Sequence, residues 1–148
     1  MARFTDPVTV YSGDSDSGTW IIEGGTLETQ PTFNGDPLFS GHYRVVGGTC
    51  HFGIDVDMDN ITSFGTGQYY MKLPFPSHHN IILSDGCLHD ISSGSQYAIL
   101  GHVLAGSDVM TLLSIASNGQ HVPFTDKVPV TLSTADNFHI SGNYEIVH

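Results

Sequence analysis

Apolar and polar residues alternate with a period of two along most of this chain, which is the pattern of half-buried β-strands. The segment FHISGNYEI (138–146) shows the pattern over its whole length, and QYYMKL (68–73) repeats it. In the first segment one face carries Phe138, Ile140, Gly142, Tyr144 and Ile146. Gly, Asn and Pro break the chain at intervals of roughly 8–12 residues, which is typical of sandwiches and jelly rolls. The alternation therefore predicts an all-β fold.

The composition supports strands over helices. Only 13% of the 148 residues are charged, against about 25% in an average domain. Few Glu, Lys or Arg are available to build solvated helices. A mass of 16.0 kDa fits one domain with one core. We expect an antiparallel β-sandwich that resembles a jelly roll.

Two hairpins are predicted from turn signals between apolar runs. The segment 41–56 contains the turn Gly47-Gly48, which favours a tight hairpin. The segments 97–105 and 109–116 are apolar on both faces and are joined by a turn at 106–108. We interpret this pair as a central hairpin buried on both sides, with its second face against another subunit.

The chain is divided into two parts at residue 33. Residues 1–33 contain a polar, Gly-punctuated loop at 12–18 and two brief strand-like pieces. They are predicted to form an N-terminal arm or edge hairpin. Residues 34–148 are predicted to form the β-sandwich domain.

The charge balance excludes one class of partner. Four basic residues against fifteen acidic ones give a net charge of −11, which would repel nucleic acid and anionic membranes. Protonation of the nine histidines would bring this charge to about −2, so pH-dependent association is a hypothesis. We expect no signal peptide and no membrane span, hence a soluble protein made in a cytoplasm.

Three closely spaced carboxylates, Asp55, Asp57 and Asp59, are the first candidate site. A calcium-binding EF-hand loop also begins D-x-D-x-D but needs Gly at its sixth position and Glu at its twelfth, where this chain has Asn60 and Thr66. The intervening residues continue the apolar row Phe52, Ile54, Val56, Met58. This pattern predicts an outward strand face. Such a face could protect a sheet edge, meet Lys or Arg of a neighbouring subunit, or bind a cation, and the sequence leaves these alternatives open.

Histidines and cysteines give weaker signals. His78 and His79 in PFPSHHN are expected to point to opposite sides of a surface loop, and their spacing from His89 fits no known metal motif. A metal shared on the axis of three chains is the alternative. Cys50 and Cys87 are predicted to be buried thiols, although whether they pair stays open.

No enzyme motif is present: the sequence has no nucleophile elbow, P-loop, zincin or dinucleotide-binding pattern. We therefore predict that the chain is not an enzyme and assign no catalytic, cofactor-binding or metal-binding residues and no cofactor. The alternative is a carbohydrate-binding module. Its exposed aromatic platform would have to come from Tyr11, Trp20, Tyr69 and Tyr70.

A series of short motifs follows in order from Asn34 to Val147. They are Gly41, Tyr43 and Gly47; Phe64-Gly65-Thr66-Gly67; Tyr69 or Tyr70; Leu73-Pro74-Phe75; the apolar hairpin Tyr97 to Ile115; Pro123-Phe124; and Ser141 to Glu145. In this order they resemble a small β domain of virion proteins from phages that infect Actinobacteria.

The resemblance implies a structural protein on the surface of a tailed-phage particle, either a minor tail protein or a capsid-decoration knob. It implies a homotrimer without catalytic activity. We expect it to assemble with other tail or capsid proteins, and adhesion to a host-surface glycan is a hypothesis that the sequence leaves open. Its departures are the aspartate row, where the family is richer in Thr and Ser, and residues 1–33, which have no counterpart.

Overall fold

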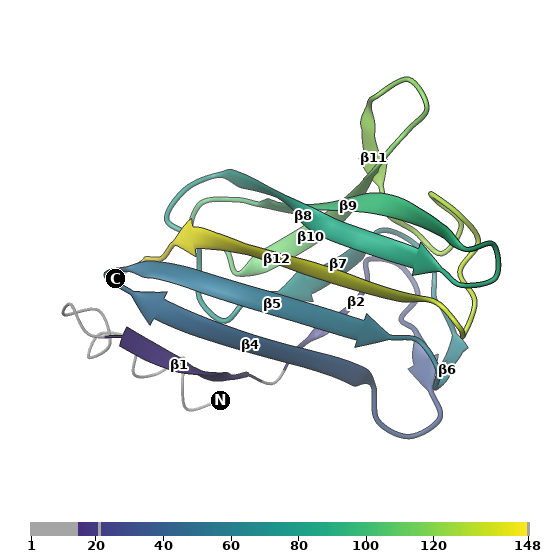
Figure 1. Ribbon diagram of the computed structural model, residues 1–148, viewed down its shortest axis with the longest axis horizontal. Helices are drawn as coiled ribbons and strands as arrows, with labels where there is room; N and C mark the ends of the chain where they lie inside the picture. The colour runs from purple at the N-terminus through teal and green to yellow at the C-terminus, as the bar shows by residue number, and fades with distance from the viewer. Residues whose placement is uncertain (1–14, 21, 148) are drawn as a thin grey trace.

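The computed structural model describes residues 15–20 and 22–147, and every regular element in that part of the chain is a β-strand (Figure 1). The strands are β1 (Ser15–Thr19), β2 (Gly24–Thr26), β3 (Thr32–Phe33), β4 (Leu38–Val46), β5 (Thr49–Asp57), β6 (Ile61–Ser63), β7 (Tyr69–Lys72), β8 (Ile81–Asp90), β9 (Ser95–Val103), β10 (Val109–Ile115), β11 (His121–Pro123) and β12 (Asn137–Glu145). The predicted all-β antiparallel fold is confirmed. Among the described residues no helix is long and apolar enough to cross a membrane.

Ten of the strands form one continuous antiparallel sheet in the order β1-β4-β5-β12-β8-β9-β10-β7-β2, with β11 paired to β10. Strands β3 and β6 form a separate two-stranded sheet. The long sheet curls so that β10, β7 and β2 lie behind β5 and β12 (Figure 1). The two layers expected of a sandwich are thus the two halves of a single sheet.

Aromatic side chains fill the space between these halves. The fully buried ring of Phe124 lies 5.3 Å from the ring of Tyr69 on β7 and 5.5 Å from that of Phe138 on β12. Tyr43 on β4 lies 5.4 Å from Phe75, which follows β7. The inward residues of the alternating segments therefore pack directly across the curled sheet.

Both predicted hairpins form. In the first, β4 pairs with β5, and Gly47 and Gly48 take φ of 57° and 86°, a conformation that glycine adopts without steric cost. In the second, β9 pairs with β10. In the single chain Thr111 and Leu113 on the outer side of β10 are half-buried, and the burial of this side by another subunit stays a prediction.

The described part of the N-terminal segment, residues 15–20 and 22–33, pairs at both ends of the long sheet. Strand β1 pairs with β4, whereas β2 pairs with β7. The loop predicted at 12–18 is a strand from Ser15 onward, because its backbone groups bond to the free edge of β4, and residues 12–14 lie outside the described residues. The buried Trp20 links the two halves, since its indole Nε1 donates to the Lys72 carbonyl at 3.3 Å.

Candidate binding surface

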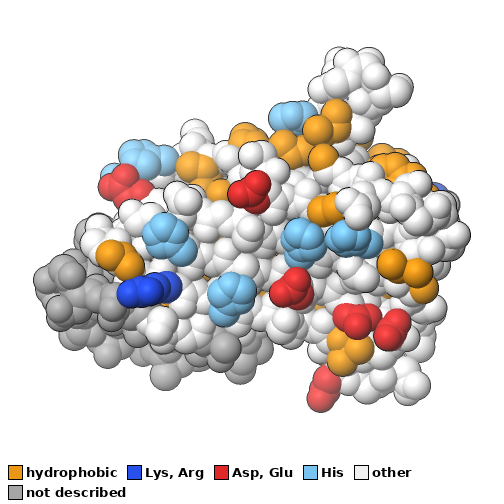
Figure 2. Space-filling model, viewed as in Figure 1, with side chains coloured by type: hydrophobic (Ala, Val, Ile, Leu, Met, Phe, Trp, Pro, Cys, Tyr) orange, Lys and Arg blue, Asp and Glu red, His pale blue; other side chains and the backbone are white. Residues whose placement is uncertain are grey.

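The outer side of β4, β5, β12 and β8 is a polar surface on which histidines gather. Figure 2 shows histidine side chains spread over these strands, with few basic side chains among them. Strand alternation places His42, His51, His139 and His89 on this side, one from each strand. We refer to this surface as the histidine face.

Strand register orders the histidine face into rows that cross the sheet. One row runs Ser40, Asp55, His139, Cys87, Ala98 from β4 to β9. The next row runs Leu38, Asp57, Asn137, His89, Gln96. Residues directly opposite each other in an antiparallel sheet have Cβ atoms about 4.5–5.5 Å apart, so the members of a row are within reach of one another.

The predicted orientation of the aspartate row is confirmed. Asp55, Asp57 and Asp59 are exposed, whereas the intervening apolar residues are buried. Edge protection, however, is not the role of these carboxylates, because β5 lies between β4 and β12 inside the sheet. Asp55 instead lies directly opposite His139 on β12.

Gly53 lies on the outward side of β5 between His51 and Asp55, yet it is buried. A Cβ atom built on this glycine would lie 2.5 Å from Cε1 of His42 on the neighbouring strand. The imidazole ring of His42 therefore covers the bare backbone of Gly53.

The two cysteines occupy different environments, and neither forms a disulfide. Cys50 is fully buried, and this burial raises the pKa of its thiol to about 12. Cys87 is half-buried on the histidine face, so the prediction of a buried thiol is correct for Cys50 only. The Sγ atom of Cys87 lies 4.0 Å from Oε1 of Gln96.

Two groups among the described residues bring three potential metal ligands together. The donor atoms of Cys87, His89 and His139 all lie within 4.8 Å of one another. The same limit holds for a second group formed by His78, His79 and Glu145. Sequence reasoning missed the first group because two of its members lie on β8 and the third on β12, some fifty residues further along the chain.

The second group corrects the prediction that His78 and His79 point to opposite sides. Their ring centroids are 4.6 Å apart, and His79 Nε2 lies 3.2 Å from a carboxylate oxygen of Glu145. The chain is not extended here, because the buried Ser77 side chain accepts from the His79 N–H and donates to the His79 carbonyl, which closes a tight turn.

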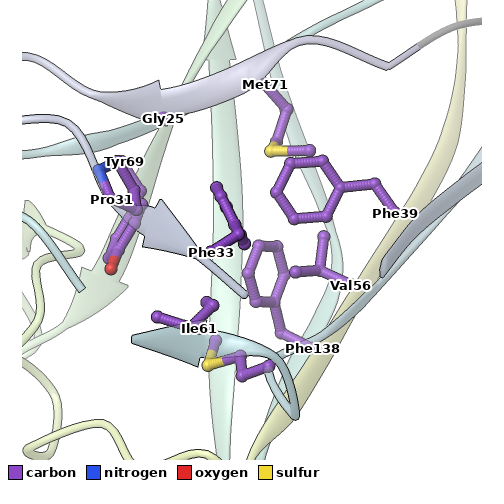
Figure 3. A pocket seen from close by; sticks show the side chains of 10 residues that line it. Gly25, Pro31, Phe33, Phe39, Val56, Ile61, Tyr69, Met71 and Phe138 are labelled. Carbon is purple, nitrogen blue, oxygen red and sulfur yellow. The ribbon is translucent and has the colours of Figure 1, made fainter. Parts of the chain in front are cut away.

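An enclosed apolar cavity of about 20 Å³ lies at the end of the molecule near β3 and β6. Phe33, Phe39 and Phe138 point into it from three different strands (Figure 3). Its volume is close to that of one water molecule and its lining is apolar, so it is a packing defect of the core rather than a ligand pocket.

A carbohydrate platform built from the candidate aromatic residues is not supported. Trp20 and Tyr69 are only 5% and 6% exposed, and the Tyr69 hydroxyl donates to the Phe64 carbonyl. Burial and the nearby Asp126 carboxylate raise the pKa of Tyr69. Tyr70 is half-buried, and Tyr11 lies outside the described residues. Buried rings cannot stack on a sugar, so that assignment of Trp20 and Tyr69 is wrong.

Comparison with known proteins shows a likeness in fold. No model of a known protein family matches the chain, and no curated protein sequence matches it. Among solved structures, the chain is similar to the crystal structure of the Dettilon tailspike protein, with a TM-score of 0.64 and 16% identity over 88% of this chain. The match covers 24% of that protein, so this chain spans about a quarter of its length. At this identity the likeness shows a shared fold.

Proposed function

We propose that this chain is a structural protein of a tailed-phage particle, located at the tail, that acts by assembly with other virion proteins. The observation that carries the proposal is the fold shared with a phage tailspike over 88% of the chain. The order of motifs from Asn34 to Val147, which resembles virion proteins of phages of Actinobacteria, supports it independently. The tail is preferred over capsid decoration because the similar structure is a tail protein.

We further propose that the chain works without catalysis. Hydrolysis of a glycosidic bond needs two carboxyl groups that face each other across the scissile bond. Asp55 and Asp57 instead project from the same side of β5, and Asp59 lies in the turn directly after that strand. Adhesion to a host surface would then rest on loops and on the histidine face, through many weak polar contacts.

A homotrimer is part of this proposal, and the outer side of β9, β10 and β11 is the surface that suits it. Leu113 on β10 lies opposite Pro123 on β11, and Ile115 at the end of β10 is 46% exposed. Contact with a second copy would cover this apolar strip. Analytical ultracentrifugation should show a trimer, and Ile115→Lys should shift it toward monomer.

The test of location is immunogold electron microscopy of purified particles with an antibody raised against the recombinant chain, combined with mass spectrometry of the particles. Label at the tail supports the proposal, and label over the head would move the protein to the capsid. A chain that is abundant in infected cells but missing from gradient-purified particles would contradict a virion role. The same particles should be screened for hydrolysis of host cell-wall polysaccharide, and activity lost with this chain would overturn the non-enzymatic part.

A further inference from the structure

A thiol and two imidazole rings converge on the histidine face. Cys87 and His89 are two residues apart on β8 and point to the same side, and His139 on β12 lies directly opposite Cys87. The ring centroids of His89 and His139 are 5.6 Å apart. Cys87 and His89 are half-buried, so their side chains are partly fixed by neighbours.

A β-bulge in β8 places the thiol and His89 on this side. Leu83 pairs with Gly101, whereas Gly86 pairs with Ile99, so one extra residue is inserted into β8 between these positions. Before the bulge the odd-numbered Leu83 points into the core, and after it the even-numbered Leu88 does. Without the inserted residue, Cys87 and His89 would point inward, and the bulge turns them out beside His139.

The ligand types and their geometry fit a zinc ion. Zinc binds thiolate sulfur at about 2.3 Å and imidazole nitrogen at about 2.0 Å, which puts ligand atoms of a tetrahedral site roughly 3.5 Å apart. The three donor atoms of this group already lie within 4.8 Å of one another. Side-chain rotations of a few tens of degrees close the remaining difference of roughly 1 Å. We propose that Cys87, His89 and His139 bind Zn²⁺ and leave its fourth position open to water.

The surroundings favour a cation and an open fourth position. An open hollow of about 380 Å³ adjoins the group and is lined by Asp85, Cys87, His139 and neighbouring small residues. Asp55 lies opposite His139 on the other side of β12, so two carboxylates flank the ligands. Their negative charge lowers the energy of a dication at this position. No positively charged residue occupies the two described rows that cross the group.

The group of His78, His79 and Glu145 is the competing zinc site. All three of its members are exposed, and it contains no thiolate. Thiolate is the ligand that most strongly favours zinc over the hard cations of a medium. We therefore assign the zinc to the Cys87 group, and the His78 group is removed by mutation in the test below.

The experiment is an isothermal titration of the full reduced chain with Zn²⁺, in the His79→Asn background. One equivalent should bind. Co²⁺ should replace zinc and give a near-ultraviolet charge-transfer absorption, which only a thiolate ligand produces. Adding Cys87→Ser should abolish that absorption and weaken zinc binding by at least about tenfold, since even the loss of an outer-shell partner costs 10–100-fold.

His89→Asn and His139→Asn test the two imidazole ligands separately, and each should weaken zinc binding by a similar factor. His51→Asn is the matched control, because it removes a histidine from the same face outside the group and should leave binding unchanged. Circular dichroism and melting without metal check that each variant is folded. The proposal would be overturned if no zinc binds, or if binding survives both Cys87→Ser and His139→Asn. It would also be overturned if the unsubstituted chain binds zinc and His79→Asn alone abolishes that binding.

Discussion

Replacement of Phe124 by alanine tests whether the segment after β11 is part of the core. The side chain of Phe124 is fully buried and contacts the rings of Tyr69 and Phe138. Its backbone joins two strands of the sheet, since the Phe124 N–H donates to the Leu112 carbonyl at 3.0 Å and its carbonyl accepts from the Tyr69 N–H at 2.8 Å. Alanine keeps these backbone bonds and removes only the ring.

The expected loss of stability is about 4 kcal/mol. Truncation of a buried Phe to Ala costs about 3–5 kcal/mol through lost transfer energy and the cavity that remains. The two ring contacts, each worth about 0.5–1.5 kcal/mol beyond area burial, keep the expected loss from falling below the middle of that range. For a domain of this size, 1 kcal/mol corresponds to about 2–4 °C, so the melting temperature should fall by about 8–16 °C.

Urea unfolding followed by tryptophan fluorescence measures this loss directly, because Trp20 is buried and lies in the same core. Phe64→Ala is the matched control. Phe64 is half-buried between β6 and β7, and its truncation should cost only about 1–2 kcal/mol. If Phe124→Ala costs no more than Phe64→Ala, the segment that carries Phe124 does not belong to the cooperative core of the curled sheet.

Three further predictions concern titratable groups. In the folded protein a thiol reagent at neutral pH should modify Cys87 and spare Cys50, as mass spectrometry of the labelled peptides would show; equal labelling would contradict the assigned burial. The pKa of Cys50 is raised from 9.0 to about 12, so the contribution of the neutral thiol to stability is complete below pH 9 and is lost as the pH rises toward 12. The urea midpoint should therefore fall over this pH range, and Cys50→Ala should remove that part of the fall. The Ser92 and Ser93 hydroxyls donate to Asp90 and hold its pKa below the ordinary value of 3.8, so this carboxylate stabilises the fold above that pH and loses its effect as the pH falls. In the double variant Ser92→Ala, Ser93→Ala, an NMR titration should show that the pKa of Asp90 has risen. An unchanged pKa of Asp90 would refute the role of the two hydroxyls.

The local features of the fold could be predicted from the sequence alone. Strand alternation in residues 52–58 correctly assigned Ile54 to the core and Asp55 to the surface. The turn at Gly47-Gly48 correctly fixed the first hairpin. These features depend on a side-chain period of two and on turn conformations, both of which act over a few residues.

The order of strands was decided by tertiary structure. Nothing in the local pattern places β12 between β5 and β8, yet this position brings His139 beside Cys87 and Asp55. The same strand order places β5, which carries Asp55 and Asp57, inside the sheet. At an edge these charges would have discouraged pairing with other chains, but β5 has no free edge. Such pairings join segments far apart in the chain, and they follow from how whole faces pack rather than from neighbouring residues.

The candidate zinc group also combines features that the sequence determines with features that only the tertiary structure decides. The sequence itself determined that the chain is all-β, acidic and rich in histidines. Only the bulge in β8 and the register of β12 decided that Cys87, His89 and His139 meet. The reason is that inserting one residue reverses every later side chain on a strand, and whether a strand accepts that insertion depends on the partner strand against which it packs.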